Sequence, residues 1–217
     1  LDLLNSGFDY FAGGGFEGKH NDKEDKEYCG DIFDLAPTKG YKVVHKLEDF
    51  RKASRSDGKI IYSSDKKHAM RYAIDNDGKE PTIAELTAKG IELLDNPNGF
   101  FMMVEGGKID YACHGNDATT SLNDILALNA AVEEAVNFSK KHPGEVLIIV
   151  TGDHETGGMT MGVAGTGYAL HVDRLKNQKC SIERFSRMLK NEARRIKKEE
   201  KRSMEYEDVI PLLEKWF

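Results

Sequence analysis

EVLIIVTGDHETGG, residues 145 to 158, combines the two features that decide the fold. Its first part is an uninterrupted aliphatic run, which is typical of a strand buried on both faces of a parallel sheet. Its second part places Asp153 and His154 directly after that run, with three glycines around them. Adjacent residues of a regular strand point to opposite faces, so these two side chains converge only if the chain is already turning, which glycine permits. The stretch therefore predicts a buried strand that ends in a turn bearing polar ligands.

A second apolar run, GFFMMV at residues 99–104, stops at Glu105 and is followed by Asp110 and His114. Between the two runs, residues 119–140 place apolar side chains at helical spacing, with a hydroxyl side chain of residues 119–121 as the expected N-cap. Parallel strands joined by such a crossover helix end at the same edge of a sheet, and that edge is where open α/β sheets bind ligands. We therefore expect the acidic and imidazole groups of the two segments to lie close together.

The rest of the chain alternates between strand and helix patterns. Further strands are expected at residues 8–15, 41–45 and 59–64, and further helices at residues 47–54 and 79–96. Pro81 suits the first turn of the second of these helices. The alternation predicts an α/β fold with a mostly parallel sheet. Residues 1–180 are then a partial α/β core, and the charged residues 181–217 are a helical segment packed on it.

Carboxylate and imidazole groups in this arrangement are typical ligands of divalent metal ions. Asp110 and His114 are four residues apart and would share one face of a helix. Imidazole with carboxylate suits zinc, with bonds of about 2.0–2.2 Å, and a site richer in oxygen suits magnesium. Four or five such ligands can hold two ions about 4 Å apart, an arrangement used in phosphoryl transfer.

Simpler roles stay open for the same residues. An aspartate–histidine pair often forms only a loop hydrogen bond, and Glu105 can simply cap the turn that follows it. Cys113 is a small thiol of the kind that cores bury. Three other polar residues are expected behind the ligands or on the surface, namely Asp117, Glu155 and His171.

The composition and charge of the chain argue against several classes of protein. The chain has 217 residues, 31% of them charged, and its formal net charge of −6 argues against a nucleic acid partner. No run approaches the roughly 18 apolar residues of a membrane-spanning helix, and the opening LDLLNSGFDYF is unlike a signal peptide. Three cysteines are too few for a disulfide framework and leave at least one unpaired.

At these residues the sequence resembles the alkaline phosphatase family. MVEGGKIDYACH is similar to the family's VEGG-x-ID-x-x-x-H segment, VTGDHETGG to its V-T-x-DHETGG segment, and FAGGG to its LGGG turn. The resemblance runs in order through about residues 1–165. It implies a three-layer α/β/α sandwich and a metal-dependent hydrolysis of phosphate monoesters through a phosphoserine intermediate.

The same resemblance implies a role for each of five residues. Glu105 matches the family's magnesium ligand, Asp110 and His114 match ligands of a first zinc ion, and Asp153 and His154 match ligands of a second. The implied cofactors are two zinc ions and one magnesium ion, with partial occupancy or none expected in this chain alone.

Other parts of the family's site have no match in the sequence. The nucleophilic serine, expected in an Asp-Ser-Ala type segment upstream of the glycine turn, is missing, because Ser63-Ser64-Asp65 has another order and follows that turn. The bridging aspartate, the phosphate-binding arginine, the threonine ligand of magnesium and the late histidine ligand are also unmatched. The resemblance therefore predicts the middle of a longer phosphatase, inactive alone, with no catalytic residue in this chain.

Two other functions stay open at this point. One is a non-catalytic metal-binding or interaction module derived from the family. The other is a related metal-dependent phosphoesterase or sulfatase, although DHETGG with VEGG-x-ID fits alkaline phosphatases better. The resemblance also implies a periplasmic or secreted location and a homodimer as the common form of the family.

Overall fold

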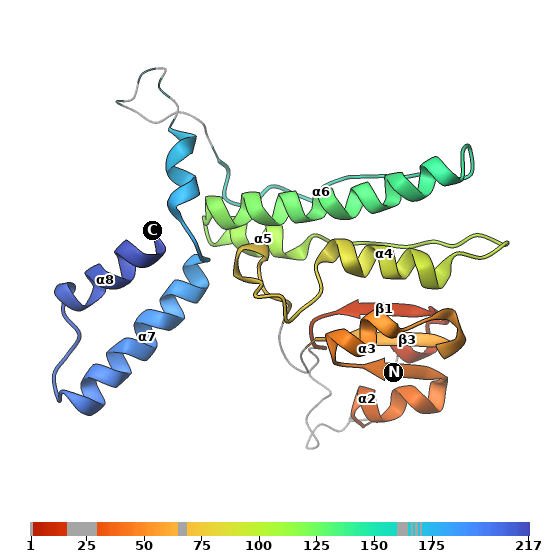
Figure 1. Ribbon diagram of the computed structural model, residues 1–217, viewed down its shortest axis with the longest axis horizontal. Coiled ribbons are helices and arrows are strands. Elements are labelled where there is room, and N and C mark those ends of the chain that lie inside the picture. Colours follow the sequence, from red (N-terminus) through yellow and green to blue (C-terminus); the bar gives the residue numbers. More distant parts are fainter. Residues whose placement is uncertain are drawn as a thin grey trace. The chain divides into compact units, whose positions relative to one another are not determined.

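The computed structural model describes residues 2–16, 30–64, 69–159, 165, 167, 169 and 171–217 (Figure 1). The chain forms two compact units. The first comprises Leu1–Arg71, Asp77–Glu105 and Ala127–Ile149, and the second comprises Tyr72–Asn76, Gly106–Leu126 and Val150–Phe217. Among the helices described, none combines the length and hydrophobicity that crossing a bilayer requires. The division that the sequence suggests at residue 180 stays a prediction.

The first unit is built on a parallel sheet, as the sequence predicts. Its strands are β1 (Tyr10–Gly13), β2 (Tyr41–Val44) and β3 (Lys59–Ser63). Their order in the sheet is β1-β3-β2, and both pairings are parallel. The central strand β3 is rich in β-branched and aromatic residues, which pack well on a pleated surface buried on both sides.

Side chains of β3 alternate between two apolar clusters, one on each face of the sheet. Ile60 and Tyr62 pack with Phe50 and Leu86 on one face. Ile61 packs with Tyr41 and residues of the N-terminal helices on the other. Because both faces are covered by helices, the unit has the three layers of an α/β/α sandwich, and the expected fold class is confirmed (Figure 1).

Two helices of this unit lie close to the positions predicted for residues 47–54 and 79–96. The helices of the unit are α1 (Asp2–Asn5), α2 (Ile32–Leu35), η2 (Ala36–Lys39), α3 (Leu47–Lys52), η3 (Arg55–Asp57) and α4 (Ile83–Leu94). Thr82 and Glu85 form a capping box at the start of α4, each side chain bonded to the other residue's backbone N–H. Pro81 therefore precedes the N-cap instead of lying in the first helical turn.

The two apolar runs that the sequence assigns to buried strands are not strands in the structure. Residues 99–105 and 145–151 have no regular secondary structure, and many of their apolar side chains are exposed. A hydrophobic run favours a buried strand only where a neighbouring strand completes the ladder, and among the described residues none does so. The prediction of two buried strands is therefore wrong for this chain, although the helix between them is confirmed.

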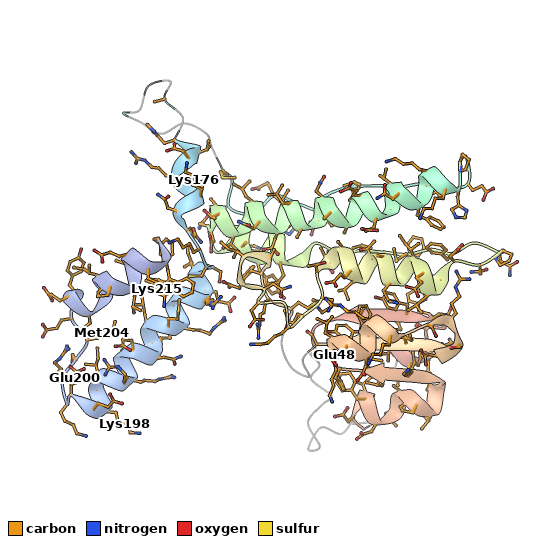
Figure 2. All side chains as sticks on the ribbon, viewed as in Figure 1. Glu48, Lys176, Lys198, Glu200, Met204 and Lys215 are labelled. Carbon is orange, nitrogen blue, oxygen red and sulfur yellow. The ribbon has the colours of Figure 1, made fainter. Side chains whose placement is uncertain are left out.

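The second unit is helical. It holds η4 (Ala73–Asp75), α5 (Gly107–His114), the start of α6 (Ala118–Lys141), η5 (Val172–Asn177), α7 (Ile182–Glu199) and α8 (Tyr206–Trp216). Lys198 and Glu200 lie at the end of α7, Met204 lies in the turn that follows, and Lys215 lies on α8 (Figure 2). The rings of Phe185 and Phe217 are 5.0 Å apart, so the closing residues pack against α7.

The buried carboxylate of Asp117 organises this unit. It accepts hydrogen bonds from the backbone N–H and hydroxyl of Thr120 in the first turn of α6. It also accepts from the backbone N–H of Ile182 at the start of α7 and from the side-chain amide of Gln178. The N-cap of α6 is thus an aspartate, and not one of the hydroxyl residues 119–121. A carboxylate is a better acceptor here than a hydroxyl group, because its negative charge is stabilised by the positive N-terminal ends of both helix dipoles.

Two more buried carboxylates belong to the same network. Asp75 accepts hydrogen bonds from the backbone N–H and the hydroxyl of Ser181, the N-cap residue of α7. Asp124, on α6, accepts from the backbone N–H of Ala73 at 3.2 and 3.3 Å. Burial, helped by the nearby negative charge, raises the pKa of Asp124 to about 6, although the Ala73 N–H and Lys108 act in the opposite direction.

We expect Asp124→Asn to remove a pH dependence of folding stability. The folded protein holds the Asp124 proton up to about pH 6, whereas the unfolded carboxyl loses it near about pH 4. The stability due to this proton is therefore complete below about pH 4 and is lost as the pH rises to about 6, by on the order of 1–3 kcal/mol. Urea unfolding of both proteins at about pH 4 and about pH 7 measures this loss. An equal loss in the variant would contradict the prediction.

Candidate metal centre

Helix α5 carries the first two candidate ligands. Asp110 and His114 lie one turn apart, so their side chains share a face, and His114 Nε2 lies 3.4 Å from Asp110 Oδ1. Both side chains are accessible to solvent, whereas Ala112 between them is buried and anchors the helix. The VEGG-x-ID-x-x-x-H pattern therefore presents one carboxylate and one imidazole on an open face of a short helix.

The turn of the DHETGG segment brings a third ligand to the same place. His154 Nε2 lies 3.8 Å from Asp110 Oδ1, and the rings of His114 and His154 are 6.1 Å apart. Each of Asp110, His114 and His154 offers one ligand atom, and these atoms all lie within 4.8 Å of one another. The donor set fits a zinc ion, because one carboxylate oxygen and two imidazole nitrogens are ligands that zinc prefers.

A backbone hydrogen bond orients the imidazole of His154. Its Nδ1 lies 2.6 Å from the carbonyl oxygen of Glu155, so the proton is on Nδ1, and Nε2 faces the carboxylates. The Glu155 carbonyl and the nearby carboxylates raise the pKa of His154. Backbone N–H groups and His154 lower the pKa of Asp153, whose Oδ2 lies 3.5 Å from His154 Nε2. A metal ion at Nε2 therefore competes with a proton that the same carboxylates favour.

Gly157 lies so close to the end of α5 that a side chain would not fit there. A Cβ atom at this position would lie 2.5 Å from Oδ1 of Asn116 and 2.8 Å from the carbonyl oxygen of Cys113. Gly157 thus lets the turn that carries His154 approach the end of α5. Gly158 adopts φ +64°, a conformation that side-chain-bearing residues rarely adopt.

We expect Gly157→Ala to weaken metal binding without unfolding the protein. The added methyl group must push the turn away from α5, and a ligand displaced by about 1 Å no longer matches zinc geometry. We expect a loss of about tenfold in zinc affinity, measured by isothermal titration calorimetry. Gly152→Ala is the matched control, because a Cβ atom there meets nothing within 4 Å. Equal affinities of the two variants would count against the proposed role of Gly157.

Not every residue that the sequence suggests joins this cluster. Asp153 is nearly fully exposed and contacts His154, but it is not one of the three convergent residues. Glu105 is exposed and belongs to the first unit, so its role as a magnesium ligand stays a prediction. Cys113 is half-buried, with Sγ 3.0 Å from the hydroxyl of Ser121, which agrees with a structural thiol.

Sequence reasoning missed the groups that support the cluster. Asp117 is expected at the surface or behind the ligands, yet it is buried, caps α6 and accepts a hydrogen bond from the first residue of α7. Its position directly before a long helix is the sequence signal that would have identified it, since aspartate is a preferred N-cap residue. The close contact of Gly157 has no such signal, because it depends on where the turn meets α5.

The fold and the cluster together define an α/β protein with a carboxylate–imidazole site suited to a divalent metal ion. The alkaline phosphatase family model matches residues 5–209 of the sequence. The chain therefore belongs to the alkaline phosphatase family, a family of phosphate-releasing hydrolases.

Similarity to individual relatives covers only part of their length. The chain is 40% identical to alkaline phosphatase 4 of Bacillus subtilis (strain 168) over 97 residues, which are 44% of this chain and 21% of the relative. It is similar to the solved alkaline phosphatase of Thermus thermophilus with a TM-score of 0.74 at 29% identity, covering 88% of this chain and 41% of that chain. A mutant alkaline phosphatase of the Antarctic bacterium TAB5, solved with Mg bound, matches with a TM-score of 0.54 at 26% identity, covering 65% and 39%. The chain thus spans less than half the length of these relatives.

Proposed function

We propose that this chain supplies part of the metal centre of an alkaline phosphatase that hydrolyses phosphate monoesters through a phosphoserine intermediate. The observation that carries the proposal is the convergence of Asp110, His114 and His154, whose ligand atoms lie within 4.8 Å of one another. Two sequence segments that match the family supply these residues, and the family match covers residues 5–209.

The proposed ligand roles follow the family resemblance. Asp110 and His114 hold a first zinc ion, Asp153 and His154 hold a second, and Glu105 binds magnesium. The short distances among Asp110, His114 and His154 support a metal role for these three residues. The relative from bacterium TAB5 was solved with Mg bound, which supports magnesium as one of the ions.

Bound metal ions would supply Lewis acidity that stabilises the charge of a transferring phosphoryl group. The chain's own residues prepare the site for this chemistry. The Glu155 carbonyl holds the Nδ1 proton of His154 and leaves Nε2 free for coordination. Helix α5 fixes Asp110 and His114 on one face, so the carboxylate and imidazole are placed before an ion arrives.

The test compares metal binding with turnover in the purified 217-residue chain. We expect the chain to bind zinc in a calorimetric titration and to release no detectable p-nitrophenol from p-nitrophenyl phosphate in the presence of zinc and magnesium. Hydrolysis that survives in His154→Ala would have another origin, and hydrolysis that this change abolishes would show that the chain is active alone. Absence of zinc binding would refute the proposed metal role.

The resemblance also supports an exported location and a homodimer for the parent phosphatase. We propose this location and this oligomeric state together with the function. Size-exclusion chromatography with light scattering tests the homodimer directly.

A further inference from the structure

Helix α5 carries Asp110 and His114 but is short and weakly anchored by its own sequence. It spans Gly107–His114, and its N-cap is Gly106, which has no side chain to accept a hydrogen bond from the helix. Helices shorter than about 12 residues are only marginally stable without tertiary contacts. Ala112 is buried, but its methyl group makes few contacts. The positions of the two ligands therefore depend on contacts that other side chains of α5 make.

Lys108, in the first turn of α5, makes such a contact. Its ammonium nitrogen Nζ lies 3.7 Å from the centre of the Tyr72 ring and 4.6 Å from the centre of the Tyr111 ring. A cation is attracted to the face of an aromatic ring within about 6 Å of the ring centre. Tyr72 is buried and lies directly before η4, whereas Tyr111 belongs to α5. The Lys108 ammonium therefore ties α5 to the segment before η4.

The electrostatic surroundings of Lys108 suit a positive charge. Burial lowers the pKa of Lys108, whereas the carboxylates of Glu183 and Asp124 act in the opposite direction. Burial, together with Glu183, raises the pKa of Tyr72, so its ring stays neutral. A half-buried ammonium group is costly unless its surroundings replace the lost water. Two ring faces and the nearby carboxylates provide that compensation here.

Lys108 and the candidate ligands lie on different sides of α5. Successive residues of an α-helix are about 100° apart around its axis, so Asp110 lies about 200° from Lys108. His114 shares the face of Asp110, and both side chains are accessible to solvent. The contacts of Lys108 thus hold one side of the helix while the ligands project from the other. Lys108 can act on the metal centre only through the placement of α5.

We propose that Lys108 is a positioning residue of the metal centre. Its ammonium group, held between the rings of Tyr72 and Tyr111, fixes α5 so that the two ligands of this helix stay beside His154. In the VEGG-x-ID segment Lys108 occupies the x position, to which the family resemblance assigns no role. The inference rests on the proposed metal role of this chain.

The test compares two variants that separate the charge of Lys108 from its hydrocarbon stem. Lys108→Met keeps an unbranched apolar stem and loses the charge, whereas Lys108→Arg keeps the charge and can stack on an aromatic ring. We expect Lys108→Met to lower zinc affinity by about tenfold, the lower end of the effect of groups that support ligands. Lys108→Arg should retain most of the affinity. Calorimetric titration of the full 217-residue chain measures both, and urea unfolding checks that each variant is folded.

Lys215→Met is the matched control. The ammonium nitrogen of Lys215 lies 5.4 Å from the centre of the Trp216 ring on α8, so this change also removes a charge over an aromatic ring in the same unit. Lys215→Met should bind zinc like the wild type. Unchanged affinity in Lys108→Met, an equal loss in Lys108→Arg, or an equal loss in Lys215→Met would overturn the proposal.

A double-mutant cycle tests the contact with the nearer ring. Tyr72→Leu removes that ring and keeps an apolar side chain. Combined with Lys108→Met, it should lower zinc affinity by less than the product of the two single losses, because both changes remove the same contact. Losses that multiply would mean that the two residues act independently and would count against the proposed contact.

Amide hydrogen exchange in EDTA tests the placement of α5 without metal. Lys108→Met should speed the exchange of α5 amides by about tenfold and leave those of α4, in the other unit, unchanged. Unchanged exchange in α5 would overturn the proposed action of Lys108. If the wild-type chain binds no zinc, the proposed metal role fails, and the exchange result still decides whether Lys108 holds α5.

Discussion

Replacing His154 by alanine should lower the zinc affinity of the chain by at least about 100-fold, since loss of a group that merely supports a ligand already costs about 10–100-fold. His154 Nε2 is one of three ligand atoms that lie within 4.8 Å of one another. The Glu155 carbonyl holds its ring in the tautomer that leaves Nε2 free. Removal of the ring leaves Asp110 and His114 as the only members of the cluster, and two ligands bind zinc weakly.

Isothermal titration calorimetry of wild-type protein and His154→Ala with zinc measures this effect. His142→Ala is the matched control, because His142 also lies near a carboxylate, 3.9 Å from Glu145, but outside the cluster. The control should bind like the wild type. Unchanged affinity in His154→Ala, or an equal loss in His142→Ala, would remove the basis for the metal centre.

The second large effect concerns the sheet. Ile61→Ala should lower the free energy of unfolding by about 2–5 kcal/mol, the range for large-to-small changes in a packed core. Ile61 lies in the central strand β3, is fully buried, and contacts the cluster formed with Leu4, Ala36 and Tyr41. Alanine would leave a cavity in the layer between the sheet and the N-terminal helices.

Urea unfolding followed by circular dichroism measures this loss. Leu126→Ala is the matched control, because Leu126 is 67% exposed and its truncation should change stability by less than about 0.5 kcal/mol. Amide hydrogen exchange of β3 shows whether the loss arises in the sheet. A loss for Ile61→Ala no larger than that for the control would mean that this layer contributes little to stability.

The sequence predicted the elements of the sheet because their signals are local. Alternating or continuous apolar residues at 10–13, 41–44 and 59–63 indicate strands wherever neighbours are supplied, and this chain supplies them. The same reasoning failed at residues 99–105 and 145–151. An apolar run indicates that a segment is stable when buried. Whether it forms a strand depends on a neighbouring strand, and the run itself carries no information about that neighbour.

Part of the candidate site could be predicted from the sequence. The residues meet through helix spacing and a turn contact, and not through the shared sheet edge that the sequence suggested. Asp110 and His114 converge because a helix places them one turn apart, a rule that sequence spacing carries directly. His154 joins them although the runs before Glu105 and Asp153 form no sheet edge in this chain. The contact depends instead on the tight approach of Gly157 to the end of α5, which is a tertiary contact.

The supporting network was the least predictable part. Asp75 and Ser181 are 106 positions apart in the sequence and meet only in the folded chain. Composition and periodicity assign acidic residues to the surface by default, because burial of an unpaired charge is costly. The backbone donors at two helix starts compensate that cost here, and only the three-dimensional placement of those helices reveals it.

The single side chain that serves two helix starts has a consequence for how the helical unit opens. The Asp117 carboxylate accepts from the first turn of α6 and from the backbone of Ile182 at the head of α7, so fraying of either end breaks bonds that hold the other. The two ends should therefore open as one cooperative block with a shared opening free energy. Amides of Thr120 and Ile182 should then exchange with solvent at rates that rise together when denaturant is added.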